Sequence, residues 1–195
     1  MSSEWTSKLK AKCKFLRGPL TTHYSPRVSL LYLYFMVYRK QFTKEQALQK
    51  AKHYCAYQER SHYEVKEKLY SFGLYKQQVE EILSQLIEES YLNEERFAIQ
   101  FAGGKFRMKQ WGRIKIKYEL KQKFVSEYCI KKALKQIDEE DYLATLKKLA
   151  EKKWATVKTD SSNKFTRLAK TTDYLLQKGY EADLVQKVVN EMNAG

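Results

Sequence analysis

Proline and glycine are scarce in this sequence of 195 residues, which contains two prolines and seven glycines. Turns and tight loops rely heavily on these two residue types, so their scarcity argues against a β architecture rich in turns. Good helix formers (Lys, Glu, Gln, Leu and Ala) dominate the second half of the chain. The composition therefore predicts an all-α protein.

Cysteine is equally sparse, with Cys13, Cys55 and Cys129 far apart and in no C-x-x-C pair. An odd number of isolated cysteines does not form a disulfide framework, and such usage is typical of a reducing compartment. We therefore expect a cytoplasmic protein.

Long apolar runs are missing as well. The run at residues 28–37 is about half of the roughly 20 residues that a membrane-spanning helix needs. The basic residues before it resemble the start of a signal peptide, but no small-residue cleavage site follows. We expect no membrane contact and interpret residues 1–40 as a basic, disordered extension. In a second interpretation translation starts at Met36, and the preceding residues come from a misassigned start codon.

Motifs for catalysis or metal binding are also lacking. The three histidines are His23, His53 and His62, and no cysteine or carboxylate stands near them at a metal-ligand spacing. Gly103-Gly104-Lys105 resembles part of a phosphate-binding loop, but the first glycine and the Ser/Thr after the lysine are absent. The sequence predicts no enzyme, no metal and no cofactor.

What the sequence does contain is helical periodicity with clear helix ends. Thr43 with Gln46, and Ser61 with Glu64, have the spacing of capping boxes, and Gly73 marks a helix stop. The clearest apolar face follows at Val79, Ile82, Leu83, Leu86 and Ile87. Three short helices with such faces can share a core only by packing together, which predicts a three-helix unit at residues 41–92.

The same pattern recurs along the chain. A shift of 51 residues places Leu69 on Leu120, and a shift of 106 places Gly73 on Gly179. Repeats of about this length are typical of helical arrays. We therefore predict three tandem three-helix repeats at residues 41–92, 93–137 and 138–195, in an elongated array that could curve into a crescent.

Local details of the second and third repeats are also predicted. Asn93 and Ser126 are expected N-caps, and Ile116, Leu120 and Phe124 are expected to form the apolar face of a middle helix. Gly103-Gly104 predicts a kink or a close backbone contact. A polar joint is expected from Thr159 to Asn163 in the third repeat.

Positive charge is unevenly distributed. The net charge is +14. Counted by segment, residues 1–40 carry 8 basic and 1 acidic side chains (+7), residues 41–92 carry 7 and 8 (−1), residues 93–137 carry 12 and 4 (+8), and residues 138–195 carry 10 and 10 (0). Such asymmetry favours a polyanion or an acidic protein surface as the partner.

The basic second repeat supplies the candidate contact residues. Cationic side chains beside an aromatic ring can neutralise phosphates or meet an acidic groove, and the indole could stack on a base. In the alternative, the tryptophan is an anchor between repeats and the lysines are solvated. The candidates are Lys105, Arg107, Lys109, Trp111, Arg113, Lys117 and Lys121.

The sequence resembles the RecX family over roughly residues 43–192. The resemblance rests on Ser61-x-x-Glu64, Lys68-Leu69, Gly73, the Val79/Leu83/Leu86 face, Tyr91-Leu92-Asn93-Glu94-x-Arg96-Phe97-Ala98, Phe101, Lys105, Arg107 and Gly112-Arg113. The family often has Asp where this chain has Asn93, and both residues cap helices. Residues 1–40 fall outside the resemblance.

The resemblance implies a cytoplasmic protein of DNA repair, recombination and the SOS response. It would bind RecA and the RecA filament on single-stranded DNA, and mostly inhibit the recombinase, ATPase and co-protease activities. It implies neither catalysis nor a cofactor, and we expect a monomer. The alternative is a helical DNA-binding module that acts directly on nucleic acid, because three-helix units also read DNA.

Overall fold

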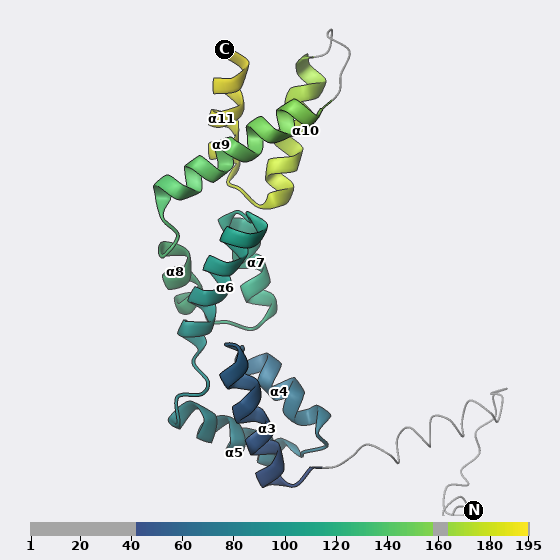
Figure 1. The fold of residues 1–195 in the computed structure, drawn as a ribbon, viewed down its shortest axis with the longest axis vertical. Coiled ribbons are helices and arrows are strands. Elements are labelled where there is room, and N and C mark those ends of the chain that lie inside the picture. Colours follow the sequence, from purple (N-terminus) through teal and green to yellow (C-terminus); the bar gives the residue numbers. More distant parts are fainter. Residues whose placement is uncertain (1–41, 158–163, 195) are drawn as a thin grey trace, which may run out of the picture. The chain divides into compact units, whose positions relative to one another are not determined.

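The computed structural model describes residues 42–157 and 164–194, which form α-helices joined by short connections (Figure 1). The expectations for residues 1–40, for Met36 and for the joint from Thr159 to Asn163 lie outside these ranges. No helix of the described ranges is long and apolar enough to cross a membrane. The helices are α3 (Lys44–Tyr57), α4 (His62–Ser71), α5 (Lys76–Glu88), α6 (Glu94–Lys109), α7 (Arg113–Gln122), α8 (Glu127–Lys135), α9 (Glu139–Thr156), α10 (Lys164–Lys178) and α11 (Ala182–Ala194).

The first unit consists of α3, α4 and α5 (Figure 1). Both predicted capping boxes are present, at Thr43/Gln46 before α3 and at Ser61/Glu64 before α4. Gly73 has φ 85°, so the predicted glycine stop after α4 is confirmed. The unit encloses a core of its own, formed by Ala47, Ala51, Cys55, Val65, Leu69, Leu74, Val79, Ile82, Leu83, Leu86 and Leu92.

The second unit (α6–α8) and the third unit (α9–α11) share one continuous core. Asn93 and Ser126 cap α6 and α8 as predicted, with their side-chain oxygens accepting hydrogen bonds from the amides of Arg96 and Cys129. Tyr142 of α9 reaches between the units, and its ring packs against Phe106 of α6 at a centroid distance of 5.8 Å. The tandem array of three-helix units is confirmed. Two of its members are fused by burial of a common set of apolar side chains.

Phe124 was wrongly placed on the apolar face of the middle helix. The side chain of Phe124 is 72% exposed, and its neighbour Val125 occupies the core position. α7 ends at Gln122, and Phe124 adopts the left-handed conformation with φ 57°. The repeat explains this, because Phe124 lies 51 residues after Gly73 and thus takes the turn position. Its ring instead contacts Tyr63 of the first unit, with the centroids 4.9 Å apart.

The Gly103-Gly104 pair gives no close backbone contact. α6 runs as one helix through both residues. A Cβ built on Gly104 would meet nothing within 4 Å. The three atoms nearest to a Cβ built on Gly103 all belong to the guanidinium of Arg107, the closest at 2.9 Å. The prediction of a close backbone approach at this pair is therefore wrong, and such an approach occurs at Gly112 instead.

Gly104→Ala is expected to stabilise the protein by about 0.5–1 kcal/mol. Alanine restricts the unfolded chain more than glycine does and favours the helix, while the added methyl group enters open space. Urea unfolding followed by circular dichroism measures the change. A loss of stability would mean that an unrecognised neighbour occupies this face of α6.

Candidate functional site

The seven candidate residues lie on two consecutive helices of the second unit and on the connection between them. Lys105, Arg107 and Lys109 are in the last two turns of α6, and Trp111 is in the connection. Arg113, Lys117 and Lys121 follow at intervals of four on α7. The structure divides their charges into two groups, those held by carboxylates and those without an ionic partner.

Lys117 and Lys121 are held by a carboxylate of their own unit. Their ammonium groups lie 2.7 and 3.2 Å from the carboxylate oxygens of Glu127 on α8. Hydrogen bonds from Lys117 and Lys121 lower the pKa of Glu127, so this carboxylate stays ionised at neutral pH. Part of the positive charge that the sequence assigns to α7 is therefore neutralised locally.

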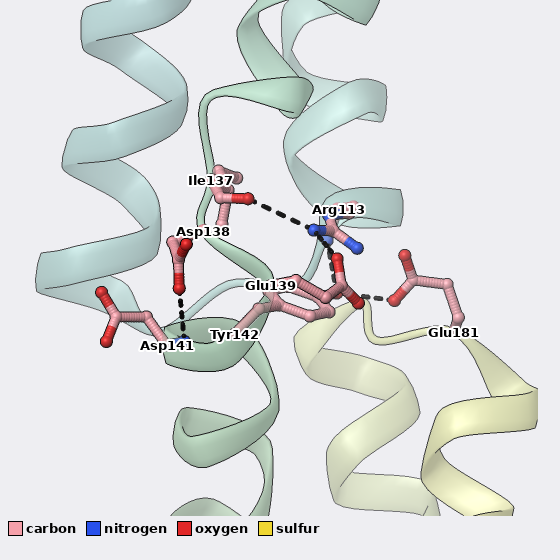
Figure 2. A network of polar contacts seen from close by, with 7 residues as sticks. All are labelled: Arg113, Ile137, Asp138, Glu139, Asp141, Tyr142 and Glu181. Carbon is pink, nitrogen blue, oxygen red and sulfur yellow. Dashed lines mark hydrogen bonds and ion pairs between the residues drawn. The ribbon is translucent and has the colours of Figure 1, made fainter.

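Arg113 belongs to the junction between the second and third units (Figure 2). Its guanidinium donates to Glu139 at 2.6 Å and to the backbone oxygen of Ile137 at 3.4 Å. The same group lies over the ring of Tyr142, 4.2 Å from its centroid. Arg113 is thus a half-buried cation held by three partners, and its contacts are those of a structural residue.

Tyr142 links the same junction through its hydroxyl. The Arg113 amide donates to this oxygen at 3.0 Å, and the hydroxyl donates to Glu181 at 2.6 Å. Burial and the hydrogen bond with Glu181 raise the pKa of Tyr142, so the phenol remains protonated and able to donate. Figure 2 shows the ring of Tyr142 beneath Arg113, with its hydroxyl end directed toward Glu181.

The start of α7 is capped by groups of the third unit. Ser61, the N-cap of α4, corresponds to Gly112 after a shift of 51 residues, and glycine offers no side-chain acceptor. The Gly112 amide donates to the Lys178 oxygen at 2.9 Å, and the Ile114 amide donates to the Gly179 oxygen at 3.0 Å. The free amides at this helix start are thus satisfied by another unit.

Gly112 and Gly179 make this capping possible because their backbones nearly touch. A Cβ on Gly112 would lie 2.1 Å from the Gly179 oxygen, and one on Gly179 would lie 2.3 Å from Cβ of Lys115. Gly179 also has φ 88°, a conformation that side chains disfavour. Both positions therefore require glycine.

Trp111 is half-buried between two lysines and packs against the shared core. The ammonium groups of Lys105 and Lys115 lie 5.2 and 4.9 Å from its ring centroid. Lys115 also donates to the backbone oxygen of Gln177 at 3.4 Å. These contacts favour the role of an anchor between the units over that of a surface for base stacking.

Arg107 and Lys109 remain as exposed cations at the end of α6, and neither forms an ion pair with any described residue. The ammonium group of Lys105, next to them, lies over the rings of Phe101 and Trp111 and forms no ion pair with a described residue. We call Lys105, Arg107 and Lys109 the α6 basic surface. Of the seven candidates, these three carry positive charge that no carboxylate of the described chain offsets.

Comparison with known proteins identifies the family. A model of the second three-helix domain of RecX matches residues 93–134, and a model of the third matches residues 139–189. The chain belongs to the RecX family. Regulatory protein RecX of Clostridium perfringens strain 13 is 36% identical over 129 residues, which are 66% of this chain and 60% of that protein. Regulatory protein RecX of Prosthecochloris aestuarii is 28% identical over 146 residues, covering 75% and 93% of the two chains.

The fold is that of solved RecX structures. The crystal structure of RecX from Lactobacillus salivarius superposes with a TM-score of 0.69 at 24% identity, covering 78% of this chain and 97% of that one. The chain spans about 60% of the length of the Clostridium perfringens RecX that it matches.

The described residues show no group of three or more His, Cys, Asp or Glu side chains that could hold a metal ion. Cys55 and Cys129 are free thiols buried in the two cores. Burial raises the pKa of Cys55 to about 11, which keeps this thiol protonated and unreactive at neutral pH. Chemistry at the described thiols is therefore disfavoured.

Gly112→Ala is expected to destabilise the protein by roughly 2 kcal/mol or more. The methyl group would overlap the backbone of Gly179 and break the hydrogen bonds that cap α7. Urea unfolding measures the stability, and hydrogen exchange should show faster exchange at the Ile114 amide. Gly104→Ala is the matched control, and equal stability of the two variants would disprove the close approach.

Proposed function

We propose that this chain is a regulator that binds RecA and its filament on single-stranded DNA and restrains the activities of the recombinase. Membership of the RecX family, whose relatives are named regulatory proteins, supports this function. The α6 basic surface supplies a means, because its unpaired charges can meet an acidic protein groove or DNA phosphates.

The ion pairs in the structure narrow the proposed contact from the seven candidate residues to three. Lys105, Arg107 and Lys109 carry the interaction in this proposal, whereas Lys117 and Lys121 first have to leave Glu127. Arg113 is expected to act mainly on the junction, since Glu139 and Tyr142 already engage its guanidinium.

The test is the ATPase activity of RecA on single-stranded DNA, titrated with the complete chain. Inhibition is expected. Arg107→Ala/Lys109→Ala should raise the half-inhibitory concentration roughly fivefold or more, because two charge contacts of about 0.5–1 kcal/mol each are lost. Lys117→Ala/Lys121→Ala removes the same formal charge from paired lysines and should have a smaller effect.

Three outcomes would contradict parts of this proposal. An unchanged ATPase at several-fold molar excess of the wild-type chain would reject RecA regulation. Tight DNA binding that falls about a thousandfold between about 50 and 200 mM salt, with no effect on RecA, would favour the DNA-binding module. Equal inhibition by both double variants would reject the α6 basic surface and leave the function standing.

A further inference from the structure

A groove between α3 and α4 of the first unit gathers cations and aromatic rings. It is an open groove with a volume of about 610 Å³, lined by Gln49, Lys50, His53, Tyr54, Tyr57, Lys68 and Phe72. This volume falls within the roughly 300–1,000 Å³ of small-molecule sites. None of these lining residues is acidic. The groove lies far along the sequence from the α6 basic surface, in a segment whose formal charge is slightly negative.

Ion pairing explains why a nearly neutral unit presents a positive groove. Carboxylates of the same unit hold the side chains of Lys44, Lys52 and Lys66. Lys50 and Lys68 form no ion pair with a described residue, and both line the groove. The neutralised lysines therefore lie outside the groove, while two that retain their full charge lie in it.

Arg60 adds a third cation beside the groove. Its guanidinium lies over the ring of Tyr54, 4.2 Å from the ring centroid, and forms no ion pair with a described residue. The Nε atom of Arg60 is buried without a hydrogen-bond partner in the described part of the chain. This cation–π contact holds the guanidinium beside a ring that lines the groove.

Two of the aromatic rings that line the groove, those of Tyr54 and Phe72, lie close to the Lys68 ammonium. The Lys68 ammonium lies 5.8 Å from the ring centroid of Tyr54 and 5.4 Å from that of Phe72. Tyr57 is different, because its side chain is 83% exposed and no described residue covers its ring. An uncovered ring next to unpaired ammonium groups combines a stacking surface with phosphate-binding charge.

We propose that this groove binds single-stranded nucleic acid. Lys50 and Lys68 would neutralise backbone phosphates, and an unpaired base would stack on Tyr57. Alternation of aromatic rings and cations along a groove is how single strands are bound without sequence preference. A duplex hides the faces of its bases, so the stacking surface selects single strands. The inference goes beyond the proposed function, because it requires no RecA.

Two matched double variants test the charges in the complete chain. Lys50→Ala/Lys68→Ala removes unpaired lysines of α3 and α4, and Lys52→Ala/Lys66→Ala removes paired lysines of the same two helices. Binding of fluorescent oligo(dT) is measured by anisotropy over a range of salt concentrations. The groove variant should lower the slope of log K against log salt by about 1.4, since each phosphate contact on a single strand contributes about 0.7.

The stacking step has its own variants. Tyr57→Ala should weaken oligo(dT) binding roughly fivefold or more, and Tyr57→Phe should retain the affinity, because stacking needs the ring alone. Tyr75→Ala, which removes another tyrosine of the first unit that is 76% exposed, is the control and should leave binding unchanged. An oligonucleotide carrying 5-iododeoxyuridine should crosslink to Tyr54 or Tyr57, as located by mass spectrometry of peptides.

Three results would overturn the proposal. The first is an equal salt slope for the two double variants. The second is crosslinking confined to α6 and α7, which would assign the DNA contact to the α6 basic surface. The third is equal binding of poly-glutamate, which would indicate an acidic protein partner. None of these measurements contains RecA, so their failure leaves the proposed regulation of RecA intact, and failure of the ATPase test leaves the groove intact.

Discussion

The contact of Gly112 with Gly179 is the constraint on which the arrangement of the second and third units depends. Only where neither residue carries a side chain can the end of α10 reach the start of α7 and accept backbone hydrogen bonds from its amides. With the two helix ends in contact, the Tyr142 hydroxyl accepts a hydrogen bond from the Arg113 amide, and the Arg113 guanidinium pairs with Glu139. The apolar faces of both units pack into one core. The first unit retains its own core and contacts the second through side chains such as Phe124 and Lys123.

Which cations of this protein can bind a partner depends more on their local ion pairs than on the net charge of each unit. The second unit is strongly basic, yet Glu127 and Glu139 hold three of its cations. The first unit is nearly neutral, yet Lys50 and Lys68 remain without ionic partners in one groove. A polyanion meets unpaired charges first, because a paired lysine has to break its ion pair before it can bind a phosphate. Both proposed contact surfaces follow from this difference.

Much of the fold was predictable, because it rests on local chemistry. In the first unit each predicted feature depends on residues only a few positions apart. These features are the two capping boxes, the stop at Gly73 and the spacing of the buried residues. Phe124 was misplaced because its apolar character fits helical periodicity, although the repeat already aligns it with Gly73. The role of Arg113 could not be predicted, since Glu139 and Tyr142 approach it only after the third unit has packed. The groove of the first unit was not predicted, because the charge was summed over whole segments. The sequence does place Lys50 four residues before Tyr54 and Lys68 four residues before Phe72, and this spacing could have indicated a surface of cations and aromatic rings.

The capping of α7 by the third unit has a consequence for shortened forms of this protein. A helix start with free amides is a ready anion site, since the amides and the helix dipole both attract negative charge. In the complete chain the amides of Gly112, Arg113 and Ile114 are occupied by oxygens of Lys178, Tyr142 and Gly179. A fragment ending before α9 would release all three beside the lysines of α7. Such a fragment would gain an artificial phosphate site, so its affinity for DNA would describe a surface that the complete protein keeps covered.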